Sequence, residues 1–214
     1  MTVAAIVVAA GRGSRFGGLK QFSRLGTLSV AAHSVSASRA VAAFVLLVVP
    51  EGYHGDGEGA DVVVVGGTSR SASVRAGLQS LPDSDIVVVH DAARPLASNK
   101  LFEAVVDAVN SGADAAIPGV AISDTLKRTV SLQGRTMVSE TLDRSELVAV
   151  QTPQAFRREV LDRAHATMSD ATDDAVLVEV AGGTVVVIAG ESQNFKITGP
   201  EDLALAAAMM GDLQ

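Results

Sequence analysis

Residues 3–20 read VAAIVVAAGRGSRFGGLK, an apolar run that breaks into a glycine-rich segment with three basic residues, Arg12, Arg15 and Lys20. The apolar run is too short for a core helix and contains β-branched residues, so it predicts a buried strand. Glycines after such a strand let backbone N–H groups approach an anion closely, and the cations add the positive charge that a triphosphate requires. The stretch therefore predicts a strand followed by a phosphate-binding turn, as in a protein that binds a nucleotide.

Charge is distributed unevenly along the chain. The first 50 residues contain five basic residues and no Asp or Glu, whereas the rest of the chain carries twelve basic and twenty-four acidic side chains. The formal net charge of −7 argues against non-specific nucleic-acid binding, which usually needs a basic surface. Only 3% of the residues are aromatic and none is Trp, so stacking platforms for single-stranded nucleic acid are not expected.

Composition predicts one cytoplasmic domain. A chain of 214 residues that is 48% hydrophobic can bury a full core, and no Pro/Ser-rich linker or low-complexity stretch divides it, so we expect a single domain over 1–214. The first apolar run is short and follows no basic residue, so neither a membrane span nor a signal peptide is predicted. The absence of cysteine excludes disulfides and thiolate metal sites and fits a cytoplasmic protein.

The chain alternates between short apolar runs and segments with a helical period. We expect strands at 3–9, 44–49, 61–65, 85–90, 113–118, 147–151 and 184–188. We expect helices at 28–41, 69–80, 99–110, 154–166, 173–181 and 200–210. Such alternation predicts an α/β fold with a Rossmann-like, mostly parallel sheet flanked by helices. In open sheets of this kind, ligands bind beyond the carboxyl ends of the strands.

One stretch, at 124–140, breaks this alternation. Two segments with a two-residue period flank Ser131-Leu132-Gln133-Gly134, a pattern typical of a β-hairpin. An isolated two-stranded hairpin is only marginally stable in water. We therefore expect a protruding arm at about 124–146 that packs on a second subunit and makes the protein a homodimer. A hairpin that folds back on its own domain is the alternative.

Two further polar segments follow predicted strands. Gly66 and Gly67 precede a helix, whose N-terminus favours anions or polar base edges, although half of such segments are only strand-to-helix turns. Asp91 and Arg94 follow the strand at 85–90. Asp91 could hold Mg²⁺ or a ribose hydroxyl and Arg94 a phosphate, or the two could form a simple ion pair.

Two common classes of nucleotide-binding protein are not favoured. A dinucleotide-binding oxidoreductase carries an acidic residue about 20 residues after its glycines, but the first acidic residue of this chain is Glu51. The P-loop pattern Gly-x-x-x-x-Gly-Lys-Ser/Thr does not occur in the first loop either.

Nine short motifs along the chain form a specific pattern. They are Ala9-Ala10-Gly11-x-Gly13-x-Arg15, Lys20-Gln21, Gly66-Gly67-x-x-Arg70-x-x-Ser73-Val74, His90-Asp91-Ala92-Ala93-Arg94-Pro95, Asp124-Thr125-x-Lys127, Asp143-Arg144, Gln151-Thr152-Pro153-Gln154, Thr172-Asp173-Asp174-Ala175 and Lys196-Ile197-Thr198-x-Pro200-Glu201-Asp202-Leu203. In this order and spacing, the chain resembles the 2-C-methyl-D-erythritol 4-phosphate cytidylyltransferase family over nearly its whole length.

The resemblance implies a single nucleotidyltransferase domain over 1–214 that transfers a cytidylyl group from CTP to 2-C-methyl-D-erythritol 4-phosphate, with release of pyrophosphate, in non-mevalonate isoprenoid biosynthesis. It implies three catalytic residues around the triphosphate, namely Arg15, Lys20 and Lys196. It implies cytidine binding by Ala9, Ala10, Gly11, Gly67, Thr68, Ser73, Asp91 and Ala92, with Asp91 also a ligand of the cofactor Mg²⁺. It implies binding of the acceptor phosphate by Arg94, Thr125, Arg144, Thr152 and Thr172, with Arg144 reaching in from the partner subunit.

Two alternative functions stay open at this point. Ribitol-5-phosphate cytidylyltransferases share the nucleotide half and act on another small polyol phosphate, although Ala93 and Lys127 favour methylerythritol phosphate. A non-catalytic CTP-binding module is the alternative of another class, because the segment between Arg15 and Lys20 is shorter than is usual in the family. The intact cations argue against this module, since binding alone would not need every charge around the leaving group.

Overall fold

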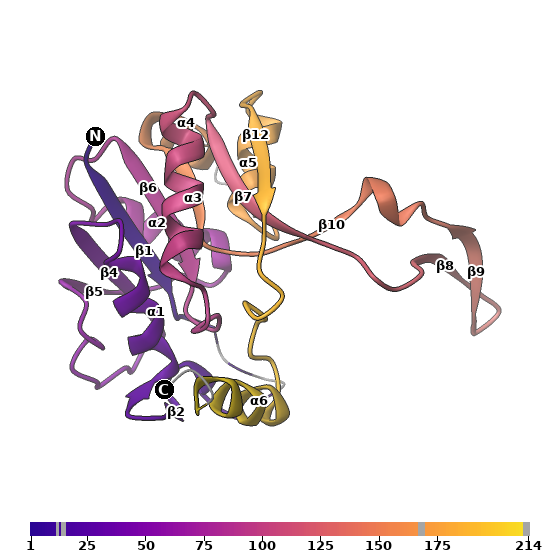
Figure 1. The fold of residues 1–214 in the computed structure, drawn as a ribbon, viewed down its shortest axis with the longest axis horizontal. Helices are drawn as coiled ribbons and strands as arrows, with labels where there is room; N and C mark the ends of the chain where they lie inside the picture. Colours follow the sequence, from indigo (N-terminus) through magenta and orange to yellow (C-terminus); the bar gives the residue numbers. More distant parts are fainter. Residues whose placement is uncertain (12, 14–15, 167–169, 212–214) are drawn as a thin grey trace.

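A mixed, mostly parallel sheet lies at the centre of the protein, and a long hairpin arm extends from it (Figure 1). The structure is a computed structural model that describes residues 1–11, 13, 16–166 and 170–211. Arg15, which is predicted to be catalytic, lies outside the described residues.

Within the described residues the sheet has eight strands. Their order is β10-β7-β11-β6-β1-β4-β5, with β12 paired to β7. The strands are β1 (Val3–Val8), β4 (Phe44–Val49), β5 (Val62–Val65), β6 (Ile86–Asp91), β7 (Ala115–Ala121), β10 (Val148–Val150), β11 (Gln154–Arg157) and β12 (Val185–Ala189). Only β10 and β11 run against the direction of the others.

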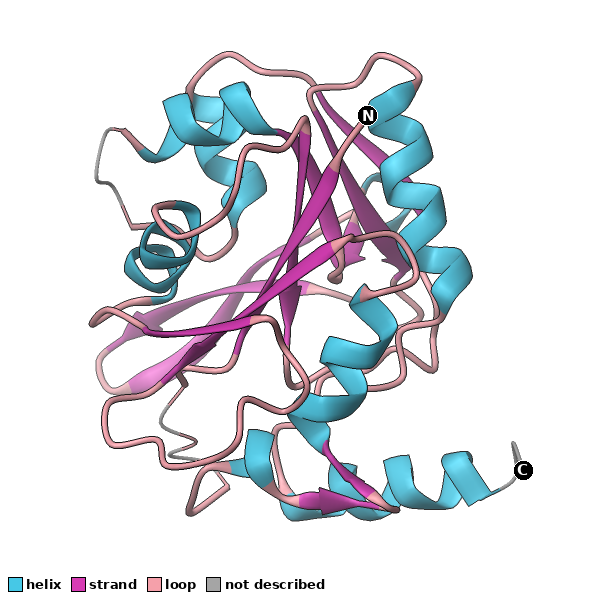
Figure 2. Cartoon of the chain, turned by 90° about the vertical axis from the view of Figure 1, so that its left-hand side faces the viewer, coloured by secondary structure: helices cyan, strands magenta, loops and turns pink. Residues whose placement is uncertain are grey.

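Helices cover both faces of this sheet (Figure 2). They are α1 (Val30–Ser38), α2 (Arg70–Leu78), α3 (Asn99–Asn110), α4 (Arg158–His165), α5 (Asp174–Val180) and α6 (Pro200–Gly211). Ala5 and Val7 of β1 pack with α1 and α3, whereas Ile6 packs on the opposite face with α2, α4 and α5. This division follows from the two-residue period of a strand, which sends neighbouring side chains to opposite faces.

Four helices begin after a polar N-cap residue. The side chains of four N-cap residues accept a hydrogen bond from the backbone N–H three residues later, and these residues are Ser29, Ser69, Ser98 and Asp173. Each cap satisfies one of the donors that a helix leaves unpaired at its N-terminus. The four residues therefore fix where α1, α2, α3 and α5 begin.

A third, smaller core connects the glycine-rich loop to the end of the chain. Leu25 and Ile197 are buried there together with Ala206 of α6, and Phe16 packs against them. Leu25 belongs to a short hairpin, β2 (Arg24–Leu25) and β3 (Leu28–Ser29), which follows the 3₁₀ turn η1 (Lys20–Phe22). This core therefore holds the segment that carries Lys196 beside the loop that carries Lys20.

The predicted helix at 154–166 is wrong over its first residues. Gln154–Arg157 form β11, which pairs antiparallel with β6 and β7, and the helix α4 begins only at Arg158. The side chains of Ala155 and Phe156 are fully buried, on opposite faces of the sheet. The segment becomes a strand because it pairs with both β6 and β7. These partners are distant in the sequence, so the local pattern of residues does not predict the pairing.

The predicted hairpin arm is confirmed, whereas its packing on a second subunit stays a prediction. β8 (Lys127–Leu132) and β9 (Arg135–Thr141) form a separate two-stranded sheet, joined through Gln133 and Gly134, which both have positive φ as a tight hairpin turn requires. All residues of the two strands are exposed, and the hairpin points away from the body rather than folding back on it (Figure 1).

No helix within the described ranges is long and apolar enough to cross a membrane.

Replacement of Phe156 should reveal how strongly β11 holds the sheet together. Its side chain is fully buried, so Phe156→Ala should lower the free energy of unfolding by about 3–5 kcal/mol through lost burial and the cavity that remains. Val180→Ala is the control, because Val180 is 81% exposed and its truncation should change stability by less than about 0.5 kcal/mol. Urea denaturation followed by circular dichroism measures both, and equal stabilities of the two variants would contradict the burial argument.

Candidate active site

A pocket of about 360 Å³ opens where β1 and β6 end, at the N-terminus of α2. This is the edge at which open parallel sheets bind ligands. The pocket is lined by Val8, Ala9, Ala10, Gly11, Gly13, Lys20, Gln21, Gly67, Thr68, Ser69, Arg70, Ser73, Asp91, Ala92, Ala93 and Lys196.

The structure brings one predicted set of residues together in this pocket and leaves another set outside it. All eight residues predicted to bind cytidine line the pocket, and so do Lys20 and Lys196. The five residues predicted to bind the acceptor phosphate do not line it, and these are Arg94, Thr125, Arg144, Thr152 and Thr172. In a single chain, the pocket is therefore a nucleotide-sized site without the predicted acceptor residues.

Gln21 shapes the first wall of the pocket. Its side chain is buried, and its Nε2 donates hydrogen bonds to the carbonyl oxygens of Ala9 at 2.6 Å and Gly11 at 2.9 Å. These bonds fix the backbone at the end of β1 with its carbonyl groups turned toward the 3₁₀ turn η1. Gln21 has no predicted role of its own in the sequence, although it belongs to the Lys20-Gln21 motif.

The glycine pair before α2 forms the opposite wall. A Cβ on Gly66 would lie 2.6 Å from the Cβ of Ala10, and a Cβ on Gly67 would lie 2.5 Å from the Cβ of Ala72. Only glycine fits at these two positions, because Gly66 lies against the loop after β1 and Gly67 lies against Ala72 of α2. The close approach explains both glycines sterically, and it also leaves Gly67 on the surface of the pocket.

Asp91 lies at the end of β6 with a cation at each carboxylate oxygen. Arg70 Nε approaches Oδ1 at 3.3 Å, and Lys196 Nζ approaches Oδ2 at 2.5 Å. Burial raises the pKa of Asp91, but the positive charges of Arg70 and Lys196 outweigh it and hold the pKa of this carboxyl well below its usual range. Asp91 is therefore ionised in the folded protein. It does not form the simple ion pair with Arg94 that was the alternative reading of this motif, since its described partners are Arg70 and Lys196.

His90 and Thr152 fix the backbone of Asp91 from behind. The N–H of Asp91 donates to Thr152 Oγ1 at 2.9 Å, and this hydroxyl lies 3.1 Å from His90 Nδ1. His90 Nε2 lies 3.1 Å from the carbonyl oxygen of Arg94, which only accepts, so we infer that Nε2 carries the proton and Nδ1 accepts from Thr152. Burial lowers the pKa of His90 to about 4, so the imidazole is neutral at pH 7.

The remaining acceptor residues lie in three different places. Arg94 Nη1 donates to the carbonyl oxygen of Asn194 at 2.7 Å, while its buried Nε has no hydrogen-bond partner among the described residues. Burial lowers the pKa of Arg94. Thr125 and Arg144 are exposed on the part of the chain that forms the arm, where Arg144 donates to the carbonyl oxygen of Ser123. Thr172 is exposed just before α5.

The residues that line the pocket offer one carboxylate as a ligand for Mg²⁺. Asp91 is the acidic side chain among the residues that line the pocket. Within the described part of the chain, no group of three or more His, Asp or Glu side chains could hold a metal ion. Mg²⁺ is commonly held by one or two carboxylates together with substrate phosphates, and the ionised Asp91 would supply one such carboxylate.

A model of a known protein family covers the motifs around the pocket and the arm. It is described as 2-C-methyl-D-erythritol 4-phosphate cytidylyltransferase, and it matches residues 3–212. The chain belongs to this cytidylyltransferase family.

Members of the cytidylyltransferase family match over nearly the full length of the chain. The 2-C-methyl-D-erythritol 4-phosphate cytidylyltransferase of Streptomyces avermitilis is 43% identical over 227 residues, with 97% of this chain and 91% of the relative covered. That of Rhodococcus jostii is 44% identical over 217 residues, with 97% and 95% covered. The crystal structure of the enzyme from Thermus thermophilus has a TM-score of 0.83 at 36% identity and covers 98% of both chains. The predicted fold class is thereby confirmed.

Besides Gln21 and Ser69, which line the pocket, two charged residues of this cytidylyltransferase site were not predicted from the sequence as site residues. Arg70 lines the pocket and contacts Asp91, and its position three residues after Gly67 was the available signal. Asp174 is fully buried and pairs with Arg70, whereas its sequence context indicated the start of a helix. A partner more than a hundred residues away in the sequence cannot be read from local context.

The neutral, buried His90 should make the stability of this cytidylyltransferase depend on pH. A histidine in the unfolded chain has a pKa of about 6.5, so it becomes protonated as the pH falls below that value. In the folded chain, His90 becomes protonated only near pH 4. Stability therefore falls as the pH falls through this window, and we expect a loss on the order of 2 kcal/mol between pH 7 and pH 5 from this residue.

Urea denaturation at the two pH values measures the effect. His90→Gln should remove this part of the pH dependence, whereas His54→Gln, at an exposed position, should retain it. The same loss of stability in His90→Gln and in the unmodified protein would show that His90 is not the titrating group.

Proposed function

We propose that the protein transfers a cytidylyl group from CTP to 2-C-methyl-D-erythritol 4-phosphate and releases pyrophosphate, a step of non-mevalonate isoprenoid biosynthesis. Membership of the family supports this activity, and relatives named for it match along almost the whole chain. The observation that carries the proposal is the pocket in which all eight predicted cytidine residues meet Lys20 and Lys196.

The chemistry of the reaction requires no general base. A phosphate monoester has a second pKa of about 6 and is mostly a dianion at pH 7. One of its oxygens attacks the α-phosphorus of CTP, the bond from that phosphorus to the bridging oxygen breaks, and pyrophosphate leaves with the electron pair. A neutral His90 buried behind Asp91 fits this scheme, because no side chain has to remove a proton from the acceptor.

What the reaction needs is positive charge around the triphosphate. We infer that Lys20 and Lys196 supply it from two sides of the pocket, together with Arg15, whose placement lies outside the described residues. The side chain of Lys196 is 40% exposed and pairs with Asp91, so a triphosphate can compete for its ammonium group. The ionised Asp91 is then available for a ribose hydroxyl or for Mg²⁺. Bound Mg²⁺ would neutralise charge on the phosphates.

We infer that a second copy of the chain completes the acceptor site. Val130 and Met137 face each other across the arm, and Leu132 lies on the same face as Val130, with all three side chains 43–55% exposed. A projecting hairpin with an apolar face needs a partner to cover it. A homodimer would cover this face and bring Arg144 and Thr125 to the pocket of the other subunit. We also propose a cytoplasmic location, for which the absence of cysteine is the argument.

Pyrophosphate release tests the activity and its acceptor together. Purified protein with CTP and Mg²⁺ should release pyrophosphate with 2-C-methyl-D-erythritol 4-phosphate and far more slowly with ribitol 5-phosphate. Lys20→Ala and Lys196→Ala should each reduce turnover by about 10²–10³, as when one donor to a developing negative charge is removed.

Lys100→Ala is the control for these lysine variants, because Lys100 is exposed on α3 and does not line the pocket. Its turnover should match that of the unmodified protein. Release with ribitol phosphate alone would assign another acceptor, and release with neither compound would contradict an enzymatic role. Near-normal turnover of either pocket variant would contradict the role of that lysine.

Mixing of two inactive variants tests the shared site. Arg144→Ala removes the arm residue and Lys20→Ala removes the pocket residue, so a mixed dimer keeps one intact pocket that faces one intact arm. After subunit exchange of equal amounts, about a quarter of all sites should be intact, as random pairing of a two-fold dimer requires. The measured quantity is pyrophosphate release before and after exchange. No recovery between subunits that demonstrably exchange would contradict the shared site.

A further inference from the structure

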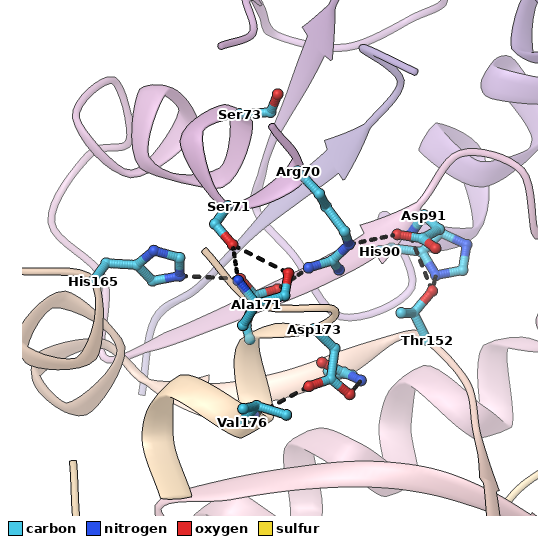
Figure 3. Close-up of polar contacts among 12 residues, drawn as sticks. Arg70, Ser71, Ser73, His90, Asp91, Thr152, His165, Ala171, Asp173 and Val176 are labelled. Carbon is cyan, nitrogen blue, oxygen red and sulfur yellow. Dashed lines mark hydrogen bonds and ion pairs between the residues drawn. The ribbon is translucent and has the colours of Figure 1, made fainter. Parts of the chain in front are cut away.

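Arg70 connects the nucleotide pocket to a buried group of polar residues behind it. Its Nε approaches Asp91 Oδ1 at 3.3 Å, and its Nη1 donates to Asp174 Oδ2 at 2.7 Å. Figure 3 shows Arg70 between Asp91 on one side and His165 on the other. The guanidinium is planar and rigid, so an anchor on one of its nitrogens also fixes the direction of the others.

Asp174 is the anchor, and it is held from a second side. Its side chain is fully buried, and its Oδ1 accepts a hydrogen bond from His165 Nε2 at 3.0 Å. Burial raises the pKa of Asp174, but the hydrogen bond from His165 and the charge of Arg70 outweigh it, so the pKa lies below its usual value. Asp174 therefore carries a negative charge that no solvent reaches.

The backbone around Asp174 is also tied to α2. The N–H of Ala171 donates to Ser71 Oγ at 3.1 Å, and the hydroxyl of Ser69 donates to Asp170. Ser69, Arg70 and Ser71, the N-cap and first two residues of α2, thus hold residues 170–174 around the start of α5. Figure 3 shows Arg70 and Ser71 beside Ala171. As a result, the position of Asp174 relative to Arg70 is set by several contacts at once.

The buried ion pair between Arg70 and Asp174 is not explained by a gain in folding stability alone. Burial of two charges incurs a large desolvation penalty, and well-packed apolar residues in their place are often as stable or more so. Asp174 does not line the pocket, and among the described residues the pocket-lining side chain with which it pairs is Arg70. We propose that Asp174 is a positioning residue for nucleotide binding, which holds Arg70 in the orientation that keeps the Asp91 carboxylate in place. This role rests on the proposed use of CTP.

The first test measures CTP binding without any acceptor. Asp174→Asn keeps the shape of the side chain but removes its charge, so Arg70 loses its anchor. The dissociation constant of CTP, from isothermal titration calorimetry, should rise about tenfold or more, as expected for the loss of one hydrogen bond between charged groups. The matched control is Asp162→Asn, which breaks an exposed ion pair with Arg158 on α4 and should leave CTP affinity unchanged.

A double-mutant cycle tests whether Asp174 acts through Arg70. Arg70→Lys keeps one positive charge, but a lysine cannot hold two carboxylates with a rigid fork. It should weaken CTP binding by a similar factor, and Asp174→Asn should add little in the Arg70→Lys background. Additive effects of the two substitutions would overturn the proposed route. If Asp174→Asn does not fold, an unchanged CTP affinity of Arg70→Lys overturns the role by itself.

The outcomes separate this role from the proposed function. Unchanged CTP affinity in Asp174→Asn, with only a lower melting temperature, would make Asp174 a purely structural residue while the enzymatic activity stands. Failure of the unmodified protein to bind CTP would overturn the proposed function and the positioning role together. Weaker CTP binding in both variants, with pyrophosphate release still measurable at high CTP, is the result expected.

Discussion

The site depends on one ionised carboxylate, Asp91, at the end of a strand that is buried along its whole length. A charge at such a place is unfavourable unless opposite charges lie close to it. Arg70 and Lys196 meet this requirement from α2 and from the segment before α6. Two parts of the chain that are far apart in sequence are thereby brought to the end of β6, and the pocket is the space enclosed between them.

Adjacent residues of β6 have opposite environments because a strand alternates its faces. The ring of His90 packs against Phe102 of α3, with ring centroids 5.0 Å apart, while Asp91 turns toward Arg70 of α2. The first stays neutral because it is buried, and the second stays ionised among cations. A shift of one residue in the pairing of β6 would exchange the two environments, so the register with β1 is as important to the site as any side chain.

Features of the fold and the site that depend on neighbouring residues were predictable from the sequence. The apolar run before Gly11 and the polar residues after the strand at 85–90 predicted the pocket edge, because strand ends and glycine turns are recognisable from neighbouring residues. The conformation of Gln154–Arg157 was not predictable in this way, because it depends on pairing with β6 and β7, which are distant in the sequence. Nor was the pairing of Arg70 with Asp174, because no local pattern links two residues that lie 104 positions apart in the sequence.

The arm is attached to the body in an unusually simple manner. It leaves the sheet after β7 and returns as β10, and these two strands are antiparallel neighbours in which Ala121 lies opposite Val148. Antiparallel neighbours can be joined by a turn of only two residues. The whole arm is therefore an elongated hairpin connection, and its length can vary during evolution without any change to the pairing of the sheet below it. The arm and the pairing of the central sheet are in this sense separable parts of one chain.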